Sequence, residues 1–412
     1  MQETLVAIIK PFRALRPQPR YAKEVSCVPY DVVSGPEVRE FLRENPLSFL
    51  RVTRPEAVNA AVGSQGEEDA FEHARETLQK YIADEVFAFE AEPSLYVYRL
   101  VSGEHRQIGV VGCCSIDEYE EGLIKRHENT RPDKVADRTA HLLAVGAQTG
   151  LILLAFRGTD LIHKLIEQEE ESEPIYDFCS DGVQHTIWRV VLTDAWTEAF
   201  DAVPALYIAD GHHRAESAKQ AREVMMKKNA EHTGAEDYNF VLAGIFPAED
   251  LRILPYNRTV KDLNGLSNEE FLRGLSRYFI VTETAKEVPQ THGEICMYLD
   301  GKWFDLNFTV DYIRQPDPIE RLDVSILQKY VLEPVLGISD PRTDDRIEFI
   351  GGQNSVEKLK AAVDDGRASV AFSLFATTMS DLLEISDLNQ IMPPKSTWFE
   401  PKLKDGLLVH LI

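Results

Sequence analysis

The sequence has few cysteine residues, and their spacing excludes the usual zinc and redox motifs. Five occur among 412 residues, two of them are adjacent, and no Cys-x-x-Cys pair is present. They are Cys27, Cys113, Cys114, Cys179 and Cys296. We expect small buried side chains in a protein that resides in the reducing cytoplasm.

Long apolar runs are absent as well. No segment approaches the roughly 20 consecutive apolar residues that cross a bilayer. The apolar run at residues 5–9 is too short for a signal peptide, and its positive charge, Lys10, stands on the wrong side. We expect this run to form a first strand, and we expect no membrane partner.

Positive charge is scarce relative to negative charge. The sequence has 44 Lys and Arg residues against 68 Asp and Glu residues, which gives a formal net charge of -24. Such a surface repels the phosphate backbone of nucleic acids, and the basic residues are scattered rather than gathered in a stripe. We therefore expect no nucleic acid partner, and we attribute the acidity to solubility.

Strand-like and helix-like segments are mixed along the first part of the chain. The strand-like runs are residues 95–100, 107–115, 151–156, 185–192, 205–209 and 239–246. The helix-like runs are residues 117–128, 134–149 and 214–228. This mixture predicts an α/β to α+β fold with a mixed sheet at its core, and we place this domain at residues 1–258.

A smaller α+β domain is predicted at residues 259–392, followed by a tail at 393–412 that folds back on the core. Ser267 is expected to cap a helix. The dipeptide Asp300-Gly301 favours the tight turn of a β-hairpin between two apolar runs. The remaining expected elements are helices at 324–332, 355–363 and 379–390 and strands at 347–350 and 369–375.

The most distinctive segment joins the apolar strand at 205–209 to the helix at 214–228. A strand that ends in glycine and opens a helix directs backbone N–H groups forward, where they can bind an anion. Gly211 allows a ligand to approach the backbone closely. This arrangement is typical of a phosphate-binding turn.

The side chains of the turn favour a functional role. His212, His213 and Arg214 supply donors suited to phosphate oxygens, and Asp210 is a candidate Mg2+ ligand or proton acceptor. Basic side chains in a first turn oppose the helix dipole unless an anion compensates them. In the structural alternative, Asp210 only caps the helix and the histidines pack or face water. Zinc is not favoured, because no His-x-x-x-His or cysteine pair completes a site.

Seven blocks of sequence follow one another through nearly the whole chain. They are residues 11–17 (PFRALRP), 29–33 (PYDVV), 45–50 (NPLSFL), 127–134 (HENTRPDK), 146–150 (GAQTG), 209–214 (ADGHHR) and 395–401 (KSTWFEP). Together they resemble the bacterial and archaeal family called domain of unknown function (DUF) 1015. Cys27-Val28 departs from that pattern, which often has a small residue and a second proline there.

The Asp-Gly-His-His-Arg box by itself resembles the phosphate-binding box of the ParB and sulfiredoxin superfamily, which includes nucleotide-dependent kinases of free serine. The resemblance implies a ParB/sulfiredoxin-like nucleotide-binding part and the phosphorylation of a small hydroxyl compound. Sulfiredoxin-like reduction needs a cysteine in the box, where His212 or His213 stands. ParB-like DNA partitioning needs a helix-turn-helix and a basic face, which the acidic composition disfavours.

Further polar residues of the matching blocks are candidates for the same site. Arg131, Lys134, Thr149 and Lys395 are candidate phosphate or nucleotide ligands. Glu128 is a candidate catalytic base or Mg2+ ligand. Whether such distant segments reach the turn is a question for the structure.

Tyr30 and Asp31 are candidate substrate ligands on a turn-prone segment. Structural roles stay open for all these residues. In the structural alternative, Tyr30 and Asp31 belong to a rigid loop, residues 127–134 form a surface helix junction with weak ion pairs, and residues 148–150 end a helix.

These residues predict a phosphotransferase that uses ATP or ADP with Mg2+ to phosphorylate a small hydroxyl metabolite, free serine being the first candidate. The candidate catalytic residues are Asp210, His212, His213 and Glu128, and the turn binds phosphate at Gly211. Two alternatives stay open. One is a nucleotide-binding regulatory protein without metabolite turnover, and the other is a metal-dependent phosphodiester hydrolase using the same histidines.

Overall fold

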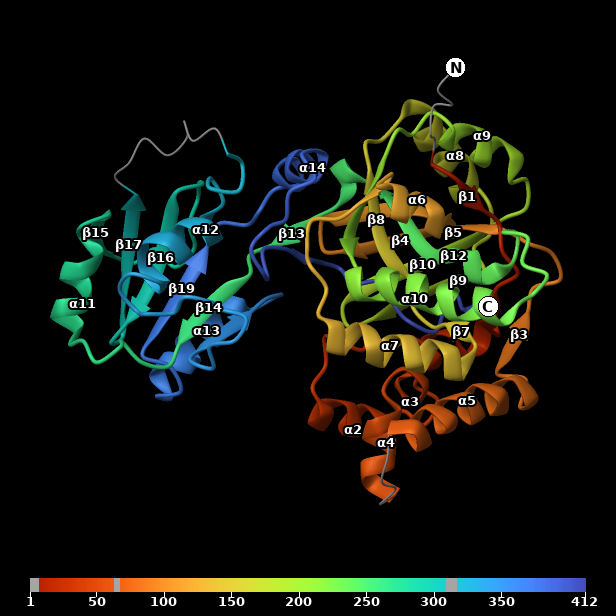
Figure 1. Ribbon diagram of the computed structural model, residues 1–412, viewed down its shortest axis with the longest axis horizontal. Coiled ribbons are helices and arrows are strands. Elements are labelled where there is room, and N and C mark those ends of the chain that lie inside the picture. The colour runs from red at the N-terminus through yellow and green to blue at the C-terminus, as the bar shows by residue number, and fades with distance from the viewer. Residues whose placement is uncertain (1–6, 63–66, 309–316) are drawn as a thin grey trace. The chain divides into compact units, whose positions relative to one another are not determined.

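The computed structural model describes residues 7–62, 67–308 and 317–412. The chain divides into two compact units, which are drawn in Figure 1. The first unit comprises residues 1–126, 130–251 and 401–412, and the second comprises residues 127–129 and 252–400. Within the described ranges, no helix combines the length and apolar character that crossing a membrane requires.

A mixed sheet of nine strands forms the centre of the described part of the first unit. Its order is β6-β11-β8-β12-β5-β4-β10-β9, and β1 pairs with β5 beside this path. The strands are β1 (Ile9–Lys10), β4 (Leu95–Ser102), β5 (His105–Ser115), β6 (Ile124–Lys125), β8 (Ile152–Phe156), β9 (Tyr176–Ser180), β10 (Val183–Val190), β11 (Leu206–Asp210) and β12 (Phe240–Pro247). The β6–β11 and β8–β12 pairs are parallel and the others antiparallel, so the predicted mixed sheet is confirmed.

All six strand-like runs predicted in the first part of the chain form strands of this sheet. The run expected at the N-terminus forms β1 only from Ile9, and its residues 5 and 6 lie outside the described residues. Two smaller pairs complete the first unit. They are β2 (Leu15–Pro17) with β3 (Phe87–Phe89) and β7 (Ala147–Gln148) with β21 (His410–Leu411).

Helices cover the first unit, and α7 and α10 lie side by side in Figure 1. The α-helices are α1 (Ala22–Val25), α2 (Gly35–Glu44), α3 (Leu50–Thr53), α4 (Pro55–Val62), α5 (Glu67–Ala83), α6 (Ile116–Glu121), α7 (Pro132–Val145), α8 (Asp160–Glu170), α9 (Asp194–Phe200) and α10 (His212–Lys228). Short 3-10 helices are η1 (Pro19–Tyr21), η2 (Asp237–Asn239) and η3 (Ala248–Asp250).

Two predicted helix ends were wrong, and glycine explains both. The helix expected at 117–128 ends at Glu121, because Gly122 takes a left-handed cap conformation, and the chain then forms β6. The helix expected at 134–149 ends at Val145 in the same way at Gly146, and the chain then forms β7. Residues 127–131 therefore do not close a helix but join β6 to α7.

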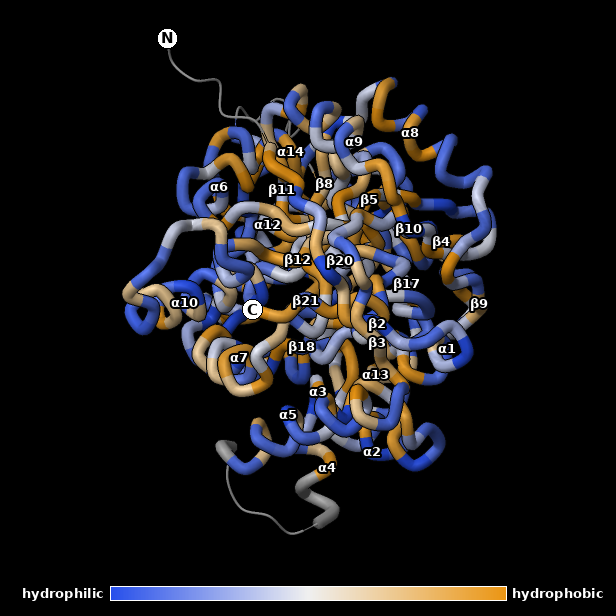
Figure 2. Tube along the Cα trace, turned by 90° about the vertical axis from the view of Figure 1, so that its right-hand side faces the viewer, coloured by the Kyte–Doolittle hydropathy of each residue, from blue (hydrophilic) through white to orange (hydrophobic). Residues whose placement is uncertain are grey.

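One face of the sheet packs against helices. Val110 of β5 and Ile245 of β12 share an apolar cluster with Phe200 of α9 and Ala218 of α10. In Figure 2 the central strands are mostly orange, for hydrophobic residues, whereas α8 alternates between orange and blue. The small alanine side chains of α10 let this helix lie close to the sheet.

The opposite face of the sheet packs against residues 401–412. Neighbouring residues of a strand face opposite ways, so Gly244 of β12 points away from the helices that Ile245 contacts. A β-carbon at Gly244 would lie 3.0 Å from Cδ1 of Leu403. The hydroxyl group of Tyr98 on β4 accepts a hydrogen bond from the backbone N–H of Lys404 at 3.5 Å. The C-terminal segment is therefore a layer of the first unit.

The second unit is built on an antiparallel sheet of the order β15-β17-β16-β19-β14-β18. The strands are β14 (Asn257–Val260), β15 (Phe279–Thr284), β16 (Glu294–Leu299), β17 (Lys302–Phe308), β18 (Ile347–Ile350) and β19 (Val370–Leu374), with β13 (Ile253–Leu254) and β20 (Trp398–Phe399) as a separate pair. The helices are α11 (Asn268–Leu275), α12 (Asp323–Leu327), the π-helix η5 (Gln328–Leu332), α13 (Ser355–Asp364) and α14 (Met379–Asp387).

The expected hairpin and helix cap of the second unit are confirmed. β16 and β17 pair in antiparallel fashion around Asp300-Gly301, both with positive φ, as a primed turn requires. The side chain of Ser267 caps α11 and accepts a hydrogen bond from the backbone N–H of Glu270.

A buried histidine ties α7 to the helices around it in the first unit. Nε2 of His141 donates to the backbone carbonyl of Val52 on α3 at 2.7 Å. Its ring packs edge-on against Phe71 of α5, with 5.7 Å between ring centroids. Burial, aided by the charge of Arg138, lowers the pKa of His141 to about 4. The imidazole is therefore neutral in the folded protein at neutral pH.

This histidine predicts a pH-dependent loss of stability. Since its pKa is depressed on folding, its contribution is present above about pH 6.5 and is lost as the pH falls towards 4, where the unfolded chain binds the proton first. The contribution is on the order of 3 kcal/mol. We expect His141→Gln to show a smaller drop in melting temperature between pH 7.5 and pH 4.5 than the wild type, measured by calorimetry.

The matched control is His73→Gln, which changes an imidazole whose side chain is 43% exposed. This variant should show the wild-type difference between the two pH values. An unchanged difference in His141→Gln would contradict the proposed titration.

Candidate functional site

The predicted turn connects the last residue of β11 to the first residue of α10. Asp210 ends β11, Gly211 adopts φ of +94°, and His212 begins the helix. This φ lies in the left-handed region, which is open to glycine and strained for other residues. A β-carbon at Gly211 would also lie 3.1 Å from Cγ2 of Ile152 and 3.2 Å from Nε of Arg214. Both backbone conformation and packing therefore require glycine.

The helices α7 and α10 begin beside each other. The backbone N–H of Arg131, which caps α7, donates to Nε2 of His213 in the first turn of α10 at 3.1 Å. The positive ends of two helix dipoles therefore lie close together, an arrangement that favours an anion. Lys134 is exposed in the first turn of α7, and the guanidinium of Arg131 pairs with Asp133 at 2.8 Å.

A cavity opens in the first unit between α7, α10 and the link from β7 to β8. The cavity is small: the space open to the centres of water-sized molecules is about 40 Å³. Three of the predicted site residues, Tyr30, Thr149 and Arg214, line it although they are far apart in the sequence. The other polar lining residues are Thr53, Arg138, His141, Gln148, Ser217 and Asp405.

Arg214 and Asp405 form a buried ion pair in this cavity. Nη1 of Arg214 lies 3.6 Å from Oδ1 of Asp405, and the same group donates to the backbone carbonyl of Leu151. The Asp405 side chain is only 3% exposed. Burial raises the pKa of Asp405 to about 7 even though the charge of Arg214 acts to lower it. Burial is the largest influence and acts to lower the pKa of Arg214, but the charges of Asp405, Asp31, Asp210 and Tyr30 together outweigh it, so the net direction is upward.

Sequence reasoning missed Asp405, whose position is determined by contacts with distant segments. Its backbone N–H donates to the carbonyl of Cys27 at 2.9 Å, and its carbonyl accepts from the N–H of Cys27 at 3.2 Å. A β-carbon at Gly150 would overlap the Asp405 carboxylate, and one at Gly406 would overlap the ring of Phe49. The local signal was an Asp-Gly pair, which by itself predicts only a turn.

Asp210 is already paired within the first unit. Its Oδ2 accepts a hydrogen bond from Nζ of Lys402 at 2.6 Å. Burial acts to raise the pKa of Asp210, but the charges of Lys402 and Arg214 outweigh it and hold the pKa well below its usual range. Asp210 therefore stays ionised, which suits a cation ligand better than a proton acceptor.

Tyr30 reaches the cavity from the loop before α2. The guanidinium of Arg138 lies 4.4 Å from the centroid of the Tyr30 ring. Burial, with a smaller contribution from the neighbouring charge of Asp31, raises the pKa of Tyr30 to about 12, so the phenol keeps its proton. Nη1 of Arg54 donates to the Tyr30 carbonyl at 2.7 Å and holds the loop. Asp31 itself is exposed.

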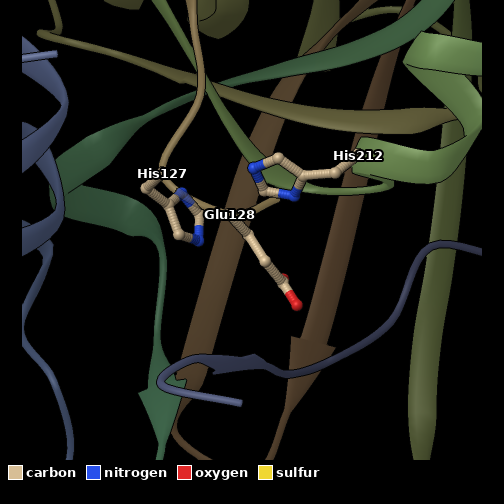
Figure 3. A group of neighbouring side chains, drawn as sticks. All are labelled: His127, Glu128 and His212. Carbon is tan, nitrogen blue, oxygen red and sulfur yellow. The ribbon is translucent and has the colours of Figure 1, made fainter. Parts of the chain in front are cut away.

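Two predicted site residues belong to segments of the second unit. Figure 3 shows Glu128 with His127 and His212, residue types that can ligate divalent metal ions. Residues 127–129 group with the second unit, and His212 belongs to the first. Lys395 is exposed in the second unit, where its Nζ lies 5.5 Å from the ring centroid of Tyr256. The roles of Glu128 and Lys395 stay predictions.

Comparison with known proteins yields one family. The chain matches the model of a family described as "Protein of unknown function (DUF1015)" over residues 9–325. No curated protein matches the chain.

Solved structures with a distant likeness include three proteins. A conserved hypothetical protein from Pyrococcus furiosus is 17% identical, with 73% of this chain and 95% of that chain covered and a TM-score of 0.38. A mutant of free serine kinase in complex with AMP is 15% identical, with coverages of 72% and 92% and a TM-score of 0.38. SbnI with a C-terminal truncation, from Staphylococcus aureus, is 12% identical, with coverages of 73% and 87% and a TM-score of 0.40. At these TM-scores the likeness carries no argument about ligands. Because the family model spans most of the sequence, this chain belongs to the DUF1015 family of proteins of unknown function.

Proposed function

We propose that the first unit is a phosphotransferase that uses ATP or ADP to phosphorylate the hydroxyl group of a small metabolite, free serine being the first candidate. One observation carries the proposal. A glycine turn at the beginning of α10 adjoins a cavity that contains Arg214 and Arg138. Phosphoryl transfer needs positioned cations, an anion-binding backbone and an enclosed space for the acceptor.

Phosphate binding is supported by charge of two kinds. The dipoles of α7 and α10 contribute fixed partial positive charge where both helices begin. The guanidinium groups of Arg138 and Arg214 add charge that Asp137 and Asp405 partly compensate, and their side chains are only 10% and 15% exposed. Low exposure strengthens their attraction for a phosphate group relative to the same charges in water.

The chemistry of Asp210 fits a Mg2+ ion. It stays ionised, and while Oδ2 receives the Lys402 ammonium group, the carboxylate has a second oxygen. A bound Mg2+ would neutralise phosphate charge. Glu128 is also proposed as a Mg2+ ligand, on the residue type and its sequence block alone. Thr149 and Tyr30 would bind the acceptor, which enters the cavity that they line.

The additional proposed phosphate ligands are exposed or lie in the other unit. Arg131 and Lys134 stand at the beginning of α7, where a terminal phosphate would meet them. Lys395 is proposed as a phosphate ligand on its sequence block alone. His212 and His213 would stabilise the transferred charge in the first turn of α10.

A nucleotide-binding regulatory role is the second candidate, and one observation favours it. Arg214 pairs with Asp405, and Asp210 pairs with Lys402. The charges of the site are therefore balanced within the protein, as a site that binds nucleotide without catalysis would allow. Such a protein would bind nucleotide and release no phosphorylated metabolite.

The first experiment separates these two functions. The purified chain is incubated with ATP or ADP, Mg2+ and a panel of hydroxyl metabolites that includes serine, and products are detected by mass spectrometry. We expect one phosphorylated metabolite and an equal amount of ADP or AMP. Saturable nucleotide binding without any phosphorylated product would support the regulatory role and overturn the kinase.

Arg214→Lys tests the cation of the cavity. Lysine keeps the charge but loses the guanidinium geometry that reaches both Asp405 and Leu151, so kcat/KM should fall by about 100-fold. The matched control is Arg222→Lys on the same helix, where Arg222 is 10% exposed and pairs with Asp117 and Glu120. Equal losses in the two variants, at equal melting temperatures, would contradict the role of Arg214.

Gly211→Ala tests the backbone of the turn. Alanine at this positive φ should cost about 1–2 kcal/mol of stability, and its methyl group would press on Ile152. Gly234→Ala is the matched control, because Gly234 has φ of +88° and no atom within 4 Å of an added β-carbon. We expect both to lower the melting temperature, but only Gly211→Ala to weaken nucleotide binding in calorimetry. Wild-type affinity in Gly211→Ala would contradict the phosphate-binding turn.

A further inference from the structure

We propose that Asp405 accepts the proton of the acceptor hydroxyl group during phosphoryl transfer, an inference that rests on the proposed function of the same cavity. Among the described residues that line the cavity, Asp405 is the only carboxylate. It lies outside the sequence blocks that resemble the family and beyond residue 325, where the family match ends.

The carboxylate is held where an acceptor would bind. Gly150 packs directly against it, so no side chain separates Asp405 from the segment of Thr149 that lines the cavity. The backbone bonds to Cys27 and the left-handed Gly406 hold its own backbone on either side. A proton acceptor must first lie within reach of the hydroxyl group, and only then does its pKa matter. Asp405 is held in place by contacts from three separate segments.

The other titratable groups in or near the cavity are less suited to the task. Asp210 is occupied by the Lys402 ammonium group at 2.6 Å. Nε2 of His141 donates to the Val52 carbonyl, and the ring is buried among helices. Burial raises the pKa of Tyr30 to about 12, so its phenol is not an acceptor at neutral pH. Asp405 alone combines a place in the lining with a pKa, about 7, near the working pH.

The step balances without any additional reactant. The hydroxyl oxygen of the metabolite forms a bond to the terminal phosphorus of the nucleotide, and its O–H proton passes to a carboxylate oxygen of Asp405. The bond between that phosphorus and the bridging oxygen breaks, and the leaving ADP, or AMP when ADP is the donor, keeps the electron pair. Asp405 then returns the proton to water. Arg214, 3.6 Å away, stabilises the ionised carboxylate before the transfer.

Several charged groups surround Asp405 and set the pH at which it titrates. The charges of Arg214 and Arg138 lower its pKa, and those of Asp31 and Asp210 raise it. The other titratable groups nearby are Tyr30 and His141, which line the same cavity, Cys27, and Lys404 of its own segment. Asp405 accepts a proton only when it is ionised. We therefore expect kcat to rise with pH up to about 7 and then to level off.

Asp405→Asn is the central test, because asparagine has the same shape and cannot accept the proton. We expect kcat to fall at least about 100-fold and the rise with pH near 7 to disappear. The dissociation constant for ATP, measured by calorimetry, should change less than about threefold. Asp405→Ala should recover activity when formate is added, because formate can replace the missing carboxylate.

The matched control is Asp181→Asn. Asp181 pairs with Lys404 at 2.5 Å, so its removal loosens the same segment outside the cavity, and it should keep the wild-type kcat and pH profile. If the Asp405 variants fail to fold, Asp31→Asn gives the answer. Loss of this exposed negative charge should lower the midpoint of the rise in kcat by about 0.5 pH.

The outcomes are separable. A wild type that phosphorylates no metabolite overturns the proposed function and this inference with it. An active wild type with an Asp405→Asn variant that keeps kcat within tenfold, or that keeps the rise with pH, overturns this inference alone. Three further results would also overturn this inference alone. They are a loss of ATP affinity in Asp405→Asn as large as its loss of kcat, no recovery of Asp405→Ala with formate, and an unchanged midpoint of the pH profile in Asp31→Asn.

Discussion

The arrangement of the cavity depends on the ion pair between Arg214 and Asp405. Two charges removed from water are stable together only when their geometry and further hydrogen bonds compensate the desolvation, and loss of one partner typically costs about 3–5 kcal/mol. Arg214 gains a second acceptor in the Leu151 carbonyl, and the backbone of Asp405 is bonded to Cys27. The pair therefore joins the first turn of α10 to the C-terminal segment and to an early part of the chain.

The positive ends of α7 and α10 complement this pair with charge of another kind. A guanidinium group can be neutralised by a neighbouring carboxylate, as Arg214 is, whereas the partial charge of a helix end is fixed in the backbone. The hydrogen bond from Arg131 to His213 keeps the two helix beginnings together. A compensated cation inside the cavity and an oriented dipole at its rim are thus distinct contributions to anion binding.

Much of the fold was predictable from local pattern. The runs at β4, β5, β8, β10, β11 and β12 carry enough adjacent apolar residues to indicate buried strands, and Asp300-Gly301 predicted the hairpin of the second unit. The errors arose where a glycine ends a helix earlier than apolar periodicity indicates. At Gly122 and Gly146 the left-handed cap decides the boundary, and the two-residue strands that follow depend on pairing with distant partners.

The candidate site was predictable where its residues carry local signals. The turn around Gly211 has a strand before it and a helix after it, and Tyr30 and Thr149 stand in distinctive blocks. Asp405 has no such signal, because its burial, its pKa and its partner are all created by segments far away in the sequence. The family match, which ends at residue 325, does not reach it either.

The course of the chain has a consequence for biosynthesis. Residues 252–400 belong to the second unit, and the chain returns to the first unit only at Pro401. The entropic cost of closing such a long insertion grows slowly with its length. The insertion therefore lowers the free energy of unfolding of the complete protein only a little. During translation, however, Arg214 cannot pair with Asp405, and β7 cannot pair with β21, until residues 252–400 have been synthesised. The nascent first unit therefore passes through a stage in which the other residues lining the cavity are present but the carboxylate of Asp405 is not.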